Sequence, residues 1–290
     1  SPAAADVIVI NGGGMFVEGF KQGISKVRQY SEQFPAKPLC IGPQSFHLKS
    51  PALREILAAR IGPAVICVRE SHSQKNLDQL LAGLPHVEFL EDHDLAFRIP
   101  PEHPVFKIPR SEKHILIVER QDGEHHTRAR SNKVPAKPAW HRRLAYWILP
   151  NSVQSQLRRR RLEAKSERPT PYRRWVEHKI ETGFPAFQNL PRFTRDISSR
   201  DAATFEQFAA AIAASAVVFP DRLHVGILAA RMGKRTFLFE GSYHKCRGIF
   251  DRSLSGFPNV TLIPPPGIYA DPAGHVSTST AAERAPLDAA

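Results

Sequence analysis

Residues 216–226 have the sequence AVVFPDRLHVG, in which a short apolar run leads directly into a polar turn. An apolar run of this length, rich in valine and closed by Pro220, predicts a buried strand. The residues that follow, as far as Met232, predict a helix, so Arg222 and His224 lie at its first turn. A strand that feeds a helix in this way is the repeating unit of a parallel α/β sheet.

The same alternation continues through both halves of the chain. Before residue 100 it predicts strands at 7–10, 38–41, 64–68 and 87–90, with helices at 20–34, 51–61 and 71–81, the last capped by Ser71. After residue 110 it predicts strands at 114–118, 216–219, 235–239 and 260–263, with a further helix at 202–215. Continuous apolar strands that alternate with helices indicate parallel sheets covered on both faces.

This pattern predicts an α/β protein with two doubly wound Rossmann-like domains that face each other across a cleft, an arrangement of the GT-B type. The proline-rich residues 99–109 predict a linker between the domains. We expect an N-terminal domain at 1–108, a C-terminal domain at 109–270 with an insertion at 128–174, and a loose tail at 271–290. Ligands of such sheets bind beyond the carboxyl ends of the strands.

The net charge of +12 is concentrated in the insertion. Residues 128–174 contain fourteen of the forty Lys and Arg residues but two of the twenty-eight Asp and Glu residues, so the rest of the chain is balanced. A balanced body argues against a general nucleic-acid-binding surface. No apolar run reaches the roughly 18–20 residues of a membrane-spanning helix. Three widely separated cysteines indicate reduced thiols, and we expect a cytoplasmic protein.

Polar turns follow several of the predicted strands, and each has a structural alternative. The glycines of Asn11-Gly12-Gly13-Gly14 let the backbone approach an anion or a sugar closely, or form a tight turn without a ligand. Their spacing lacks the GxGxxG pattern of a dinucleotide site. Arg69-Glu70 is either part of a binding site or a structural ion pair. Asp92 and Asp94 either cap a turn or accept hydrogen bonds from sugar hydroxyls.

A second set of charged residues follows the strand predicted at 114–118. Arg120, Asp122 and Glu124 are two residues apart, which places them on one side of an extended backbone. They hold an anion or steer a hydroxyl, or they lie in a solvated loop. No group of His, Cys, Asp and Glu has the spacing of metal ligands, since the adjacent pair His125-His126 diverges. We therefore expect no metal and no cofactor.

Arg222 and His224 are the strongest candidates for chemistry. The start of a helix offers unpaired N–H groups and partial positive charge. Arg222 adds donors that suit a carboxylate or a phosphate, and His224 adds a group that exchanges a proton near neutral pH. The alternative is structural: Asp221 caps the helix, the arginine is incidental and the histidine is buried.

The order of these motifs resembles that of the polysaccharide pyruvyl transferase family. Six motifs occur in the family's order: Gly12-Gly13-Gly14, Gly42-Pro43-Gln44-Ser45, Val68-Arg69-Glu70-Ser71, Asp94-Leu95-Ala96, Arg120-Gln121-Asp122-Gly123-Glu124 and Arg222-Leu223-His224. Together they extend over residues 6–250. The family's usual proline is Leu95 here. The strand and helix that precede the GGG motif in the family do not occur, so we expect part of the acceptor side to be missing from this sequence.

The resemblance implies transfer of pyruvate from phosphoenolpyruvate to sugar hydroxyls of a cell-surface polysaccharide or its lipid-linked precursor, with formation of a ketal. It implies that His224 donates a proton, that Arg222 clamps the donor, and that Lys245 and Arg120 help to bind it. The acceptor is expected on the N-terminal domain and its neighbouring loop, at Gly13, Gly14, Gln44, Ser45, Arg69, Asp94, Asp122 and Glu124. Two alternatives stay open: a GT-B glycosyltransferase whose nucleotide sugar is held by Glu240, and a non-catalytic saccharide-binding protein.

The basic insertion combines clustered arginines with aromatic residues. We expect it to contact an anionic membrane, with the enzyme peripheral on the inner face of the cell membrane, because each basic residue near such a surface contributes about 1 kcal/mol. The contacting residues are Trp140, Arg142, Arg143, Trp147, Arg158, Arg159, Arg160 and Arg161. The alternatives are a solvated loop and a surface that binds a phosphate backbone.

Overall fold

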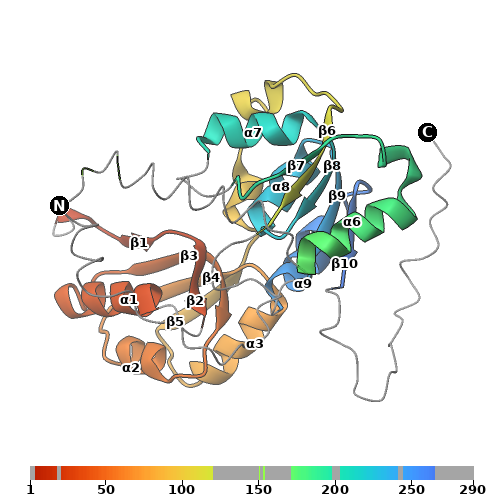
Figure 1. Cartoon of the computed structure of the whole chain (residues 1–290). Helices are drawn as coiled ribbons and strands as arrows, with labels where there is room; N and C mark the ends of the chain where they lie inside the picture. Colours follow the sequence, from red (N-terminus) through yellow and green to blue (C-terminus); the bar gives the residue numbers. More distant parts are fainter. Residues whose placement is uncertain are drawn as a thin grey trace, which may run out of the picture.

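The computed structural model describes residues 4–17, 21–119, 150, 153, 171–197, 203–240 and 244–264. Within these residues the chain forms two five-stranded sheets, each with its own helices (Figure 1). Every strand pairing is parallel. The prediction of a mixed α/β protein with parallel sheets is therefore confirmed.

The first unit follows the predicted order with one added strand. Its elements are β1 (Ile8–Ile10), β2 (Gly13–Val17), α1 (Lys21–Gln33), β3 (Leu39–His47), α2 (Ala52–Ala58), β4 (Ala64–Val68), α3 (Ser71–Leu80) and β5 (Val87–Glu91). The strands lie in the order β1-β3-β4-β5, and β2 also pairs with β3.

Strand β2 corrects the prediction of a turn at Asn11–Gly14, whereas the helix predicted at 20–34 is present as α1. Gly13 and Gly14 begin β2, and Gln44 and Ser45 lie inside β3, which extends beyond the strand predicted at 38–41. The fully buried side chain of Gln44 explains this pairing. Its Oε1 accepts from the Met15 N–H at 3.3 Å and its Nε2 donates to the Asn11 carbonyl at 3.0 Å. A tertiary contact thus converts the glycine turn into a strand.

The first sheet is covered on one face in the part of the chain that the structure describes. Helices α1, α2 and α3 contribute Val27, Leu53 and Leu77 to a single core with the buried residues of the strands. The residues that alternate with these along the strands are less enclosed, and Val9 and Leu90 are 64% and 52% exposed. This corrects the expectation that both faces of the first sheet are covered.

The second unit contains four predicted strands and one more. Its elements are β6 (His114–Val118), α6 (Pro171–Gly183), β7 (Arg192–Thr194), α7 (Phe205–Ala213), β8 (Ser215–Pro220), α8 (Leu223–Arg231), β9 (Arg235–Phe239), α9 (Lys245–Ile249), a π-helical turn at Phe250–Leu254, and β10 (Val260–Ile263). The strand order is β10-β9-β8-β6-β7.

This second sheet is covered on both faces, as its continuous apolar strands predict. Along β6, Ile115 and Ile117 pack with α6, whereas Leu116 and Val118 pack with α7 and α8. Strand β8 is buried along its whole length. Side chains that alternate along each strand thus pack against helices on the two faces of the sheet.

The residues predicted as a linker pack onto the second unit. A short 3₁₀ turn at Leu95–Arg98 precedes these residues, and a second at Pro104–Lys107 lies among them. The buried Val105 belongs to the core of α7 and α8. Arg231 of α8 donates to the carbonyls of Ala96 at 3.0 Å and Ile99 at 2.6 Å. The segment that follows β5 is therefore fixed to α8. The domain boundaries themselves stay a prediction.

Candidate active site

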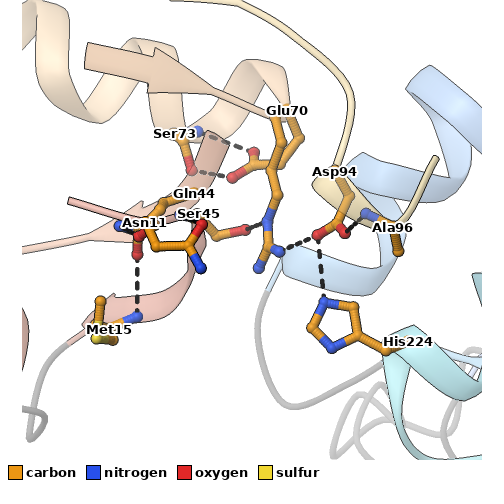
Figure 2. A network of polar contacts seen from close by, with 11 residues as sticks. Asn11, Met15, Gln44, Ser45, Glu70, Ser73, Asp94, Ala96 and His224 are labelled. Atoms are coloured by element: carbon orange, nitrogen blue, oxygen red, sulfur yellow. Dashed lines mark hydrogen bonds and ion pairs between the residues drawn. The ribbon is translucent and has the colours of Figure 1, made fainter. Parts of the chain in front are cut away.

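The carboxyl ends of β4, β5 and β8 meet at a polar network centred on Asp94 (Figure 2). Asp94 follows β5 and is 2% exposed. Its Oδ1 accepts from the Ala96 N–H at 2.9 Å, and its Oδ2 lies 3.5 Å from Nε2 of His224. The same Oδ2 pairs with Nη1 of Arg69. One buried carboxylate thus links the first sheet to the start of α8.

The charge of Asp94 is well compensated. Burial alone would raise the pKa of Asp94, but the hydrogen bond from His224 and the charge of Arg69 outweigh it and hold this pKa well below its usual range. The carboxylate therefore stays ionised at neutral pH. An anion at this place orients the His224 ring.

Three residues predicted to bind the acceptor form the framework behind Asp94. Arg69 is 1% exposed, and its Nε donates to Ser45 Oγ at 2.9 Å. Ser45 and Gln44 are fully buried, and Gln44 holds Asn11 and Met15 as described above. The structure places these side chains inside the protein, and a direct contact with an acceptor stays a prediction. The sequence predicts that Arg69 and Glu70 form either part of a binding site or an ion pair with each other. Arg69 does form an ion pair, but its partner is Asp94.

The glycines beside this framework differ in their surroundings. A Cβ on Gly12 would lie 2.6 Å from the Pro43 carbonyl oxygen, so a side chain cannot fit there without a shift. A Cβ on Gly13 or Gly14 would meet nothing within 4 Å. Open space above Gly13 and Gly14 agrees with the idea that a ligand approaches this backbone, and acceptor binding there stays a prediction.

Glu70 forms a second link between the two units. It is the N-cap residue of α3, where its Oε2 accepts from the Ser73 N–H at 2.9 Å. Ser71, the predicted cap, is instead the first residue of the helix. The other oxygen, Oε1, lies 3.5 Å from Nε2 of His244, which directly precedes α9. The His244 ring contacts those of His47 and His72, with centroids 5.3 Å and 5.0 Å away.

Helix α8 begins where the sequence predicts, but Asp221 does not cap it. Arg222 is the N-cap residue, with extended backbone and no capping hydrogen bond from its side chain. His224 is in the first turn with 59% of its side chain exposed, so the alternative of a buried histidine is wrong. Arg222 binds Asp196 through two hydrogen bonds, from Nε to Oδ1 at 2.9 Å and from Nη2 to Oδ2 at 2.6 Å.

Asp196 is a residue of this site that we did not predict from the sequence. This residue follows β7, and β7 and β8 pair with opposite sides of β6, so Asp196 and Arg222 leave the same edge of the sheet. They are twenty-six residues apart in the chain. No local pattern marks an aspartate at this distance as the partner of an arginine.

The remaining predicted residues fall into two groups. Lys245 is the first residue of α9, next to His244. Glu240, considered for nucleotide binding, accepts from Nε and Nη2 of Arg247 at 3.1 and 3.0 Å. The others lie outside the described residues: Arg120, Asp122, Glu124, and the membrane-contacting set Trp140, Arg142, Arg143, Trp147, Arg158, Arg159, Arg160 and Arg161.

The described residues contain no group of three or more His, Cys, Asp or Glu side chains that could hold a metal ion. They also contain no helix long and apolar enough to cross a bilayer. What they do present is an exposed imidazole at a helix start, beside a buried carboxylate and a buried arginine. Such an arrangement can bind an anion and move a proton.

Comparisons with known proteins identify a family and a similar fold. A family model described as polysaccharide pyruvyl transferase matches residues 2–243. No curated protein matches the chain. The crystal structure of a functional uncharacterized protein, KP1_0663 from Klebsiella pneumoniae subsp. pneumoniae NTUH-K2044, is similar with a TM-score of 0.52 and 18% identity, over 89% of this chain and 75% of that one. At this identity the likeness shows the fold alone.

Proposed function

The chain belongs to the polysaccharide pyruvyl transferase family, and on that premise we propose that it transfers pyruvate from phosphoenolpyruvate to sugar hydroxyls and forms a ketal. The acceptor in this proposal is a cell-surface polysaccharide or its lipid-linked precursor.

The contact between His224 and Asp94 supports this proposal most directly. His224 is exposed to a substrate on one side and faces an ionised, buried carboxylate on the other, at 3.5 Å. With Nε2–H directed to Asp94, Nδ1 is the nitrogen that faces away and exchanges a proton with a substrate. His224 in this geometry has the features of a general acid, and Asp94 holds its orientation.

The donor is bound at the start of α8 in this proposal. The N–H groups of the first turn and the guanidinium of Arg222 attract the carboxylate or phosphate of phosphoenolpyruvate. Arg222 keeps 21% of its side chain exposed while it binds Asp196. Lys245 at the start of α9 and Arg120 add positive charge to the donor site.

The reaction then proceeds in four steps. Protonated His224 donates its Nδ1 proton to the methylene carbon of phosphoenolpyruvate, and positive charge develops on the neighbouring carbon. A sugar hydroxyl adds to that carbon, and neutral His224 can accept the hydroxyl proton. The bond to phosphate breaks and inorganic phosphate leaves. A second hydroxyl of the same sugar adds to the same carbon and closes the cyclic ketal, and its proton passes to the released phosphate.

The acceptor lies against the first sheet in this account, over Gly13 and Gly14, where the backbone faces open space. Asp122 and Glu124 complete its binding site. The basic insertion brings the enzyme to the inner face of the cell membrane, where a lipid-linked acceptor is located.

The glycosyltransferase alternative is less well supported. Glu240, its candidate for the ribose of a nucleotide sugar, is engaged by two hydrogen bonds from Arg247. A saccharide-binding protein without activity would tolerate the loss of His224, so the same variant separates this second alternative from the proposal.

The test is phosphate release from phosphoenolpyruvate that depends on a saccharide acceptor, with the gain in mass of the acceptor as the second readout. His224→Ala should lower kcat by ~10²–10⁴-fold, the usual range for the loss of an acid or base group. Near-parental turnover in folded His224→Ala protein would rule out the catalytic role of His224.

A further inference from the structure

Asp196 and Arg222 form a pair whose geometry is more restrictive than a simple charge contact. Asp196 is 4% exposed and offers both carboxylate oxygens to Arg222. The two bonds use Nε and Nη2, which lie on one edge of the guanidinium, and such a fork fixes the plane of the group. Arg222 therefore has one orientation at the start of α8.

The pair also changes the charge that a ligand meets. A buried carboxylate at 2.6 Å offsets much of the positive charge of Arg222. This would weaken the attraction of Arg222 for any anion, which is the opposite of what a site selected for tight anion binding needs. A carboxylate in this place is useful if the direction of the guanidinium matters more than its full charge.

We propose that Asp196 is a positioning residue for the transfer reaction: it aims Arg222 at the donor and lowers the charge of Arg222. The inference rests on the proposed function, in which Arg222 binds the donor. Because orientation matters most in the transition state, the effect of Asp196 is expected in kcat rather than in the affinity for an anion.

The test variant is Asp196→Asn. The amide can still accept one hydrogen bond, but its NH₂ faces the Nη2 donor, so the fork is lost. We expect kcat to fall by about 10²-fold, the cost of a misplacement of about 1 Å. The dissociation constant for inorganic phosphate, measured by calorimetry, should stay the same or fall because Arg222 regains its full charge. An unchanged kcat, or a loss of phosphate affinity as large as the loss of kcat, would overturn the proposal.

The matched control is Glu177→Gln. Glu177 of α6 accepts from Nε of Arg192 at 3.2 Å, so the variant removes the same charge from an ion pair next to β7 but away from α8. Its kcat and phosphate affinity should equal those of the parent. If Asp196→Asn does not fold, Asp196→Glu serves instead: it keeps the charge, moves the carboxylate by one methylene group, and should show the same loss of kcat. Parental kcat in Asp196→Glu would then overturn the proposal.

Failure of the proposed function can be told apart from failure of this inference. If the parent protein transfers no pyruvate, the phosphate measurement remains, with Arg222→Gln as reference. Phosphate affinity should be lost in Arg222→Gln and kept in Asp196→Asn. Equal loss in both variants would contradict the role given to Asp196.

Discussion

Among individual side chains, Asp94 links three residues of the candidate site. It accepts a hydrogen bond from the Ala96 N–H, forms an ion pair with Arg69, and lies beside the ring of His224. Each partner favours the ionised form, and together they overcome the cost of burial. Asp94 therefore contributes both to the geometry of His224 and to the stability of the folded protein.

The low pKa of Asp94 gives a pH-dependent prediction. A carboxylate whose pKa is depressed on folding stabilises the protein above its unfolded pKa of about 3.9, and this stabilisation is lost as pH falls from there toward the folded pKa. Asp94→Asn leaves Arg69 buried without its anion, and at pH 7 we expect it to be less stable than the parent by about 3–5 kcal/mol.

The difference between the two proteins should shrink as pH falls below about 4, because the unfolded parent then binds a proton at Asp94 that the folded parent does not bind. Thermal unfolding of the parent and of Asp94→Asn, from pH 7 to pH 3, measures this difference in stability. A difference that stays constant over this range would show that Asp94 is not the ionised partner of Arg69.

The candidate residues could be predicted from the sequence only where a local pattern marks them. The strand-to-helix transition locates Arg222 and His224 correctly at the start of α8. The partners of these residues depend on the fold: Asp94 and Asp196 come from other strands, and no spacing predicts either contact. Glu70 rather than Ser71 caps α3, and its carboxylate accepts from the Ser73 N–H.

Among helices and strands, α9 packs tightly against the first unit. A Cβ on Gly248 would lie 2.8 Å from Cβ of Glu70, which is closer than real atoms approach. The contact leaves no room for a side chain between α9 and the residue that caps α3. Glycine is required there by close approach.

We therefore expect Gly248→Ala to push α9 away from Glu70. The free energy of unfolding should fall by about 1–3 kcal/mol, the usual cost of an added group in a tightly packed region. Denaturant unfolding measures the change. Gly256→Ala is the control, since a Cβ there meets nothing within 4 Å. Equal effects of the two substitutions would contradict the close contact of α9 with Glu70.

The apolar pattern of the sequence is sufficient to predict some of the strands but not all of them. Strands β4, β6, β8, β9 and β10 occur close to their predicted positions, because each is a short apolar run between turn residues. Strand β2 is missed because glycine disfavours strands in isolation, and the buried Gln44 side chain supplies the bonds that fix it. The second face of the first sheet is less covered than its apolar pattern suggests.

In the chain as a whole, the net positive charge lies in a different part of the sequence from the residues of the candidate site. The residues of the candidate site come from the balanced part of the sequence, whereas all of the net charge falls in residues 128–174. We propose that this insertion binds anionic membrane beside the acceptor. Binding to vesicles of anionic lipid should then weaken as salt increases, because salt screens exposed charges.

Replacement of Arg158–Arg161 by serine tests that role. Vesicle binding in a sedimentation assay should fall, while turnover with a water-soluble acceptor should stay near the parental value. Parental vesicle binding would show that the insertion is not an electrostatic anchor. A loss of turnover in folded protein would place these arginines in the active site instead.

The central claim is that the start of α8 binds phosphoenolpyruvate. It is tested most directly by thermal unfolding of the parent protein with phosphoenolpyruvate and, separately, with a panel of nucleotide sugars. At about 100 times its dissociation constant a ligand stabilises the folded state by about 2.7 kcal/mol. We predict a clear rise of Tm with phosphoenolpyruvate, a smaller rise in Arg222→Ala, and none with nucleotide sugars. Protection of the parent by a nucleotide sugar, with no effect of phosphoenolpyruvate, would contradict the account.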